Sequence, residues 1–133
     1  MSEKLPEPMG LYPATKRAGN LLFVSGMGPR EAGVDGVPGL EIDNHGNYIS
    51  FDFEAQVHSV FKNVKIALDQ AGSGWDNIVD VTVFLTNLER DFATYNRIYA
   101  TYFKDNQPTR TTVEVNALPS QIAIELKVIA TIG

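Results

Sequence analysis

The chain has 133 residues, and its 44% hydrophobic content is enough for one domain, residues 1–133, with a continuous core. Its formal net charge of −5 argues against a nucleic-acid partner, because binding a phosphate backbone requires clustered Lys and Arg. The absence of cysteine excludes disulfides, a thiolate nucleophile and a zinc-thiolate site.

The N-terminal segment, residues 1–8, lacks the apolar stretch of a signal peptide. No later segment reaches the length of a membrane-spanning helix. We therefore expect a cytoplasmic protein without a membrane partner.

The first part of the chain predicts a hairpin followed by a long loop. Residues 12–17 and 21–25 are strand-like runs on either side of the turn signal Ala18-Gly19-Asn20. Residues 26–46 are rich in glycine and proline, which predicts a loop with a short strand around Glu41 to Asp43. Irregular segments of this length are typical of functional or mobile regions.

Two helices and a strand are predicted next. Asp52 is suited to cap a helix that stops at Gly72, with apolar positions at helical spacing: Phe53, Val57, Val60, Phe61, Val64, Leu68 and Ala71. In the strand that follows, alternation places four residues on one face: Val79, Val81, Val83 and Leu85. A second helix, Arg90 to Phe103, is expected to have an aromatic inner stripe: Phe92, Tyr95, Tyr99, Tyr102 and Phe103.

Two strands, Thr109 to Val115 and Ile122 to Thr131, are predicted to close the fold as a hairpin. The period of two places Arg110 on the same face as Thr112 and Glu114. With Val115 near Ile122, Thr112 lies opposite Glu125 and Arg110 lies one diagonal away, so that all three share a surface.

Arg110 and Glu125 are charged residues in otherwise apolar strands, where burial is costly unless the charge is paired or used on a ligand. An arginine fork can hold a carboxylate through two bonds, and a partly buried glutamate has a raised pKa that suits proton transfer. The pair therefore predicts an anionic small-molecule substrate and acid-base chemistry. The alternative is structural: Arg110 with Glu125, and Glu114 with Lys127, would be ion pairs without chemistry.

Other motifs give weaker signals. Ser25 lacks the glycine two places earlier that a nucleophile elbow requires, so it is interpreted as a strand-end hydroxyl. Gly26-Met27-Gly28 does not complete a dinucleotide fingerprint, and no nucleotide cofactor is implied. His45 and His58 have no metal-ligand spacing, and no metal or other cofactor is expected.

The chain resembles the RidA/YjgF/UK114 family from about Gly10 to Thr131. The segments that carry the resemblance include Leu22-Phe23-Val24-Ser25-Gly26, Val81-Thr82-Val83-Phe84-Leu85, Asp91-Phe92-Ala93-Thr94-Tyr95-Asn96 and, most specifically, Arg110-Thr111-Thr112-Val113-Glu114-Val115 through Leu118-Pro119 to Ile124-Glu125. This resemblance implies a chorismate-mutase-like α+β fold, with a mixed β-sheet carrying two helices on one face, assembled as a homotrimer. Family members hydrolyse enamines and imines to ketones and ammonia in clefts between subunits, without metal or organic cofactor.

By position, Arg110 resembles the family's carboxylate-binding arginine and Glu125 the glutamate proposed to activate water. The resemblance also implies a substrate-binding role for Tyr12, Ser25 and Asn96. Thr112 stands where the family often has cysteine, at a position whose backbone carbonyl is thought to contact the ligand.

Further similarity, in Lys16-Arg17-Ala18-Gly19 and Pro108-Thr109-Arg110-Thr111-Thr112-Val113, is to the 2-aminomuconate deaminase branch, used in breakdown of aromatic compounds. Such a substrate has a second carboxylate, for which Arg30 or Arg17 is a candidate partner. The alternatives are a generic 2-aminoacrylate deaminase, a trimer that binds small carboxylates without turnover, and a nucleic-acid enzyme, which the acidic charge disfavours.

Overall fold

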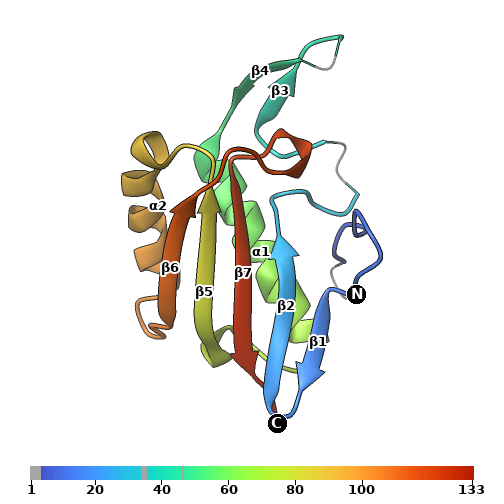
Figure 1. The fold of residues 1–133 in the computed structure, drawn as a ribbon, viewed down its shortest axis with the longest axis vertical. Helices are drawn as coiled ribbons and strands as arrows, with labels where there is room; N and C mark the ends of the chain where they lie inside the picture. The colour runs from blue at the N-terminus through green and yellow to red at the C-terminus, as the bar shows by residue number, and fades with distance from the viewer. Residues whose placement is uncertain (1–3, 34–35, 46) are drawn as a thin grey trace.

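The computed structural model describes residues 4–33, 36–45 and 47–133. Its main element is a mixed sheet with two helices on one face, as expected (Figure 1). The strand order across this sheet is β1 (Thr15–Ala18), β2 (Leu21–Met27), β7 (Ile124–Thr131), β5 (Ile78–Leu85) and β6 (Thr109–Glu114). The strands β1 and β6 are therefore the two edges.

The N-terminal hairpin is confirmed, because β1 pairs with β2 in antiparallel register. In the predicted loop, β3 (Leu40–Ile42) matches the expected short strand to within one residue. It pairs with β4 (Tyr48–Phe51), which the sequence did not predict, to form a separate hairpin that projects beyond the main sheet (Figure 1). Four residues between a turn and a helix cap give too short a pattern to identify a strand.

Helix α1 (Phe53–Gln70) begins as predicted, since the Asp52 carboxylate accepts a hydrogen bond from the Ala55 backbone N–H at 3.2 Å. Gly72 follows the helix with a φ of 85°, a conformation that glycine adopts without strain. Six of its seven predicted apolar positions are buried, and the seventh, Ala71, packs partly buried against the core.

Helix α2 (Leu88–Tyr102) starts two residues before the predicted Arg90. Tyr95 and Phe103 are buried as expected, but Phe92 is 40% exposed. The prediction for Phe92 was therefore wrong: it lies on the flank of the helix that faces β6, where it contacts the guanidinium of Arg110.

The prediction for Val79 was also wrong, because this residue is exposed and Ile78 enters the core in its place. The register between β5 and β7 shifts between Ile78 and Asp80, so a bulge reverses the side-chain alternation at the start of β5.

The predicted closing hairpin does not form. β6 pairs in parallel with β5, and β7 lies on the other side of β5, paired with both β5 and β2. The physical reason is burial: β7 alternates four residues that are at most 1% exposed (Ile124, Leu126, Val128 and Ala130), so it needs neighbours on both sides, whereas the polar β6 suits an edge. Thr112 is therefore not opposite Glu125.

The second face of the sheet, which faces the reader in Figure 1, carries no helix of the described ranges. Three large apolar side chains on the strands are 36–37% exposed there: Leu21, Phe23 and Val113. Such a face is a candidate contact surface for another protein chain. None of the helices in the described part of the chain has the length and apolar character needed to cross a bilayer.

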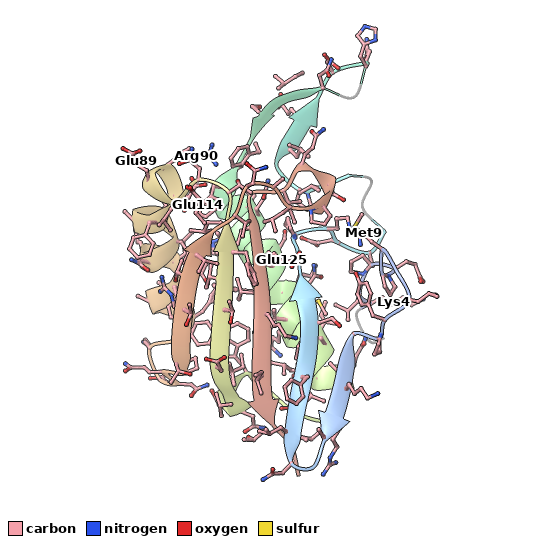
Figure 2. All side chains as sticks on the ribbon, viewed as in Figure 1. Lys4, Met9, Glu89, Arg90, Glu114 and Glu125 are labelled. Atoms are coloured by element: carbon pink, nitrogen blue, oxygen red, sulfur yellow. The ribbon has the colours of Figure 1, made fainter. Side chains whose placement is uncertain are left out.

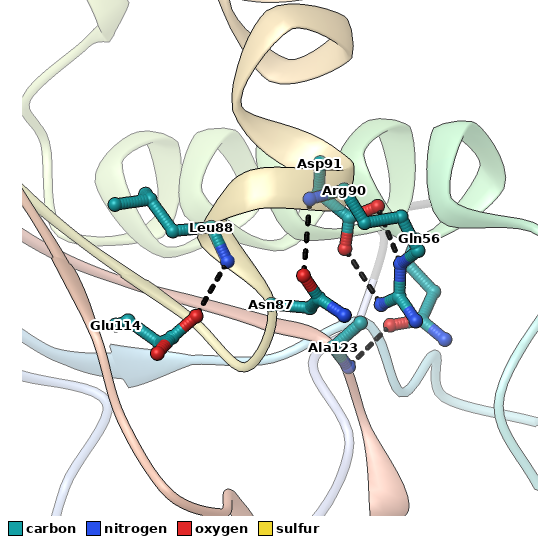
Figure 3. Close-up of polar contacts among 7 residues, drawn as sticks. All are labelled: Gln56, Asn87, Leu88, Arg90, Asp91, Glu114 and Ala123. Carbon is teal, nitrogen blue, oxygen red and sulfur yellow. Dashed lines mark hydrogen bonds and ion pairs between the residues drawn. The ribbon is translucent and has the colours of Figure 1, made fainter.

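Glu114 stabilises the start of α2. Its carboxylate accepts a hydrogen bond from the Leu88 backbone N–H at 2.8 Å, at a helix N-terminus that also favours negative charge (Figure 3). We expect Glu114→Ala to lower the free energy of unfolding by about 0.5–2 kcal/mol, measured by denaturant titration. Asn116→Ala, on the exposed loop that follows, is the control, and an equal loss in both variants would contradict this role.

Candidate functional site

Arg110 lies on the helix-covered side of the edge strand β6. Its register partner in β5 is the fully buried Val81, so its side chain points toward α2. There its Nη2 donates to the Asn96 side-chain oxygen at 2.7 Å, and its Nε donates to the Thr112 hydroxyl at 2.8 Å. The sequence-predicted residues Arg110, Thr112 and Asn96 therefore lie together.

Aromatic rings of α2 complete the surroundings of Arg110. Its guanidinium carbon lies 5.7, 5.1 and 4.6 Å from the ring centres of Phe92, Tyr95 and Tyr99. Burial raises the pKa of Tyr95 and Tyr99, and the nearby Arg110 charge only partly opposes that shift. Both phenols therefore stay neutral, and the rings hold the cation through their π faces.

Arg110 has no acidic partner among the described residues. None of their ion pairs includes it. Glu114 caps α2, and Lys127 donates to the Val24 carbonyl at 3.1 Å, so the two alternative structural ion pairs do not form within the chain. A half-buried guanidinium that is oriented by neutral groups alone is suited to an anionic ligand.

Glu125 lies on the opposite, helix-free face, beside Phe84 in register (Figure 2). Its position near the start of β7 is fixed by the fully buried Gln56 of α1, whose side-chain oxygen accepts from the Ala123 N–H at 2.8 Å (Figure 3). The carboxyl group is half-buried, and this desolvation raises its pKa.

Gly26 provides the space in which the Glu125 carboxylate sits. A Cβ at position 26 would lie 2.5 Å from Glu125 Oε2, which is closer than atoms can approach. The absence of a side chain here, at the irregular end of β2, lets the carboxylate lie against the backbone.

Gly26 also lines a cavity of about 380 Å³ beside the free edge of β2, where β1 has ended. The predicted residues Tyr12, Ser25 and Arg30 line the same cavity, which the N-terminal segment 4–8 borders. The Ser25 hydroxyl donates to the Pro13 carbonyl at 2.7 Å, and Arg30 Nη2 donates to the Glu7 carbonyl at 3.0 Å.

Arg17, the other candidate for a second cation, lies elsewhere. Its Nε donates to the Gly19 carbonyl at 2.8 Å, in the turn between β1 and β2. Of the two candidates, Arg30 is therefore the one beside Tyr12 and Ser25.

The candidate residues thus form two groups rather than one. The first group, Arg110 with Asn96 and Thr112, lies at the β6 edge on the helix side of the sheet. The second group lies toward the β1 edge and consists of Tyr12, Ser25 and Arg30, with Glu125 next to it at Gly26. The prediction that Arg110 and Glu125 share a surface in one chain was wrong, because β5 separates their strands and the two side chains point to opposite faces.

Sequence reasoning missed four residues that shape these groups. Gly26 was placed in a loop, in a discounted dinucleotide motif and in a segment of family resemblance, but it was given no role at the site. The aromatic residues of α2 were assigned to core or interface packing. The only sequence signal for a role of Phe92, Tyr95 and Tyr99 at the site is their helical spacing. Any buried helix face has the same spacing, so this signal does not distinguish a site from the core. In the described ranges, no group of three His, Asp or Glu side chains is arranged to hold a metal ion.

Comparison with known proteins gives consistent similarities. A family model described as endoribonuclease L-PSP matches residues 2–132. Reactive Intermediate Deaminase A of Arabidopsis thaliana, a chloroplastic protein, is 37% identical over 131 residues, which are 98% of this chain and 64% of that protein. A RutC family protein of Pyrococcus abyssi is 35% identical over 129 residues, covering 97% of this chain and 92% of that protein.

Solved structures show the same similarity over nearly the whole chain. The YjgF gene product of E. coli has a TM-score of 0.80 and 32% identity, with coverage of 96% of this chain and 92% of that one. YyfA of Yersinia pestis, described as a Rid family protein of unknown function, has a TM-score of 0.79 and 35% identity, with coverage of 96% and 93%.

Proposed function

This chain belongs to the RidA/YjgF family, and on that premise we propose that it is a cytoplasmic enamine/imine deaminase that hydrolyses a small carboxylate substrate to a keto compound and ammonia. The observation that carries the proposal is the state of Arg110. It is half-buried, oriented by Asn96 and Thr112, and unpaired with any acid among the described residues. It is therefore preorganised for a substrate carboxylate.

In the proposed site, Arg110 of one subunit meets Glu125 of a neighbouring subunit in a homotrimer. Two observations support this arrangement. The two residue groups lie toward opposite edges of one sheet. A ring of subunits that joins the β6 edge of one copy to the β1 and β2 edge of the next would bring the two groups together. The helix-free apolar face also gives a second copy a surface to cover.

The proposed chemistry is hydrolysis of a carbon-nitrogen double bond. Arg110 binds the carboxylate, and the enamine tautomerises to its electrophilic imine. Glu125, as general base, takes a proton from a water molecule that attacks the imine carbon and passes this proton to the nitrogen, which gives a carbinolamine. Glu125 then takes the remaining proton from the carbinolamine hydroxyl and gives it to the departing nitrogen. The C–N bond breaks as the C=O bond forms, so one water is consumed and one ammonia is released.

The narrower proposal concerns the substrate. Arg30 lines the same cavity as Tyr12 and Ser25, which supports a substrate with two carboxylates, such as 2-aminomuconate. 2-Aminoacrylate, with one carboxylate, is the alternative. Ammonia release from both compounds by the wild-type protein tests the proposal, and Arg30→Met should lower kcat/KM only for the dicarboxylate.

The same assay separates the other function classes. A non-catalytic trimer would bind carboxylates without ammonia release. A ribonuclease, as the family model's description suggests, would cleave RNA instead, although a net charge of −5 disfavours RNA binding. Absence of ammonia release from either substrate would overturn the proposed deaminase.

Gly26 provides a test of how Glu125 is positioned. In Gly26→Ala, the added Cβ must displace the Glu125 carboxyl group, so we expect kcat to fall by roughly tenfold or more while the melting temperature stays nearly unchanged. Gly74→Ala is the matched control, because no atom lies within 4 Å of a Cβ there and its φ of −176° suits alanine. Equal rates in both variants would contradict this role.

A further inference from the structure

A second hollow lies on the helix side of the molecule, and its lining includes none of the candidate site residues. This aromatic groove, of about 460 Å³, is lined by His58, Phe61, Lys62 and Lys65 of α1, by Trp75, and by Tyr102 at the end of α2. Its size is within the range of small-molecule sites. It shares no lining residue with the cavity beside β2.

Aromatic rings build the floor and walls of the groove. Phe61 packs edge-on against Tyr102, with ring centres 4.4 Å apart, and against Trp75 at 5.7 Å. Trp75 Nε1 donates to the Tyr102 carbonyl at 3.0 Å, which fixes the indole, and the Tyr102 hydroxyl is hydrogen-bonded to His58 Nδ1. Phe61 is only 2% exposed, so the ring array is anchored in the core.

The rim of the groove is basic. Lys62 and Lys65 lie one helical turn apart, and none of the described residues that line the groove is acidic. Their acidic neighbours come from outside it: Lys62 pairs with Glu31 at 3.0 Å and Lys65 pairs with Asp69 at 2.6 Å. The lysines place two cations at the rim of the groove, and each ammonium group has three N–H donors, so it can donate to a ligand carboxylate in addition to its acidic neighbour.

We propose that the aromatic groove binds a small planar aromatic carboxylate, with its ring packed against Trp75 and Tyr102 and its carboxylate directed to Lys62 and Lys65. Ring contacts supply the buried apolar area, and the lysines supply charge-assisted hydrogen bonds. A neutral ring lacks the second contribution and an aromatic amine is repelled. The site does not depend on the proposed deaminase activity.

The chain contains its own reporter, since Trp75 is the only tryptophan. Titration with 4-nitrobenzoate, which quenches indole fluorescence, is expected to give saturable quenching. 4-Nitrobenzyl alcohol should bind about tenfold more weakly, and 4-nitrobenzylamine weaker still. Free N-acetyltryptophanamide corrects for collisional quenching, and calorimetry with 4-nitrobenzoate gives an affinity independent of fluorescence.

Variants locate the binding. Lys62→Met with Lys65→Met should weaken 4-nitrobenzoate binding about tenfold or more, whereas Lys16→Met, on β1, should not change it. Glu31→Gln should strengthen binding, because Lys62 no longer shares its charge with that carboxylate. Circular dichroism confirms that each variant is folded.

Arg110→Met should leave the affinity unchanged, which separates the aromatic groove from the proposed substrate site. Three results would each overturn the proposal: equal quenching by the acid, alcohol and amine; loss of binding in Arg110→Met but not in the lysine variant; or no saturable binding because a second copy of the chain covers the groove.

Discussion

Arg110→Ala and Glu125→Gln are each expected to be inactive alone, and co-expression of the two chains is expected to restore about a quarter of wild-type activity. In a composite site, Arg110 comes from one subunit and Glu125 from its neighbour. Random assembly of equal amounts then places an intact Arg110 beside an intact Glu125 at about one interface in four. Each single variant should lose on the order of 10²-fold or more in kcat/KM, because it removes either the carboxylate anchor or the general base.

Activity returns in the mixed oligomer only if Arg110 and Glu125 of one site come from different chains. If Arg110 and Glu125 of the same chain formed the site, every chain in the mixture would carry one defect and no activity would return. Co-expression of Arg110→Ala with the doubly substituted chain is the control, since no subunit then supplies Arg110. Ammonia release by purified mixed oligomers measures the recovery, and a mixture as inactive as this control would contradict the composite site.

Local sequence determined the helices well because their signals are local. Asp52 caps α1 through a hydrogen bond to a residue three places away, and the α1 apolar stripe has one period throughout. Within β6 and β7, alternation also assigned side chains to the correct faces of each strand. Charge within apolar strands identified Arg110 and Glu125 as candidates, and family resemblance added Tyr12, Ser25 and Asn96 by position. Neither showed how these residues are arranged.

Strand pairing was wrong for a different physical reason. The sequence of residues 109–131 does not indicate that β5 lies between β6 and β7. The strand order depends on how many neighbouring strands each strand needs to bury its side chains. That one change moves Arg110 and Glu125 to opposite faces. The role of Gly26 was equally hidden, since the side chain that requires its small size is 99 positions later in the chain.

Glu125→Gln is expected to raise the melting temperature near neutral pH, while the same change removes turnover. Burial raises the pKa of Glu125 above the usual range of a glutamate side chain, so ionisation of this carboxyl group lowers the stability of the folded state. The favourable contribution of the protonated group is fully present below the unfolded-state pKa and is lost as the pH rises through the folded-state pKa. Glutamine does not ionise, so the variant avoids this loss.

The stability of the wild type relative to the variant and the turnover of the wild type should therefore change with pH in opposite directions. As the pH falls through the raised pKa, wild-type kcat/KM should decline because protonated Glu125 cannot accept a proton from water, and the difference in melting temperature should disappear. Thermal melts and ammonia release between about pH 4 and pH 8 measure both, with Glu41→Gln on the separate β3–β4 hairpin as control. A structural role would make Glu125→Gln less stable at neutral pH, because it would remove a favourable carboxylate contact. A catalytic role predicts instead that Glu125→Gln is more stable but slower by about 10²–10⁴-fold. Such a carboxylate lowers the stability of the folded state and is retained because it acts on a substrate.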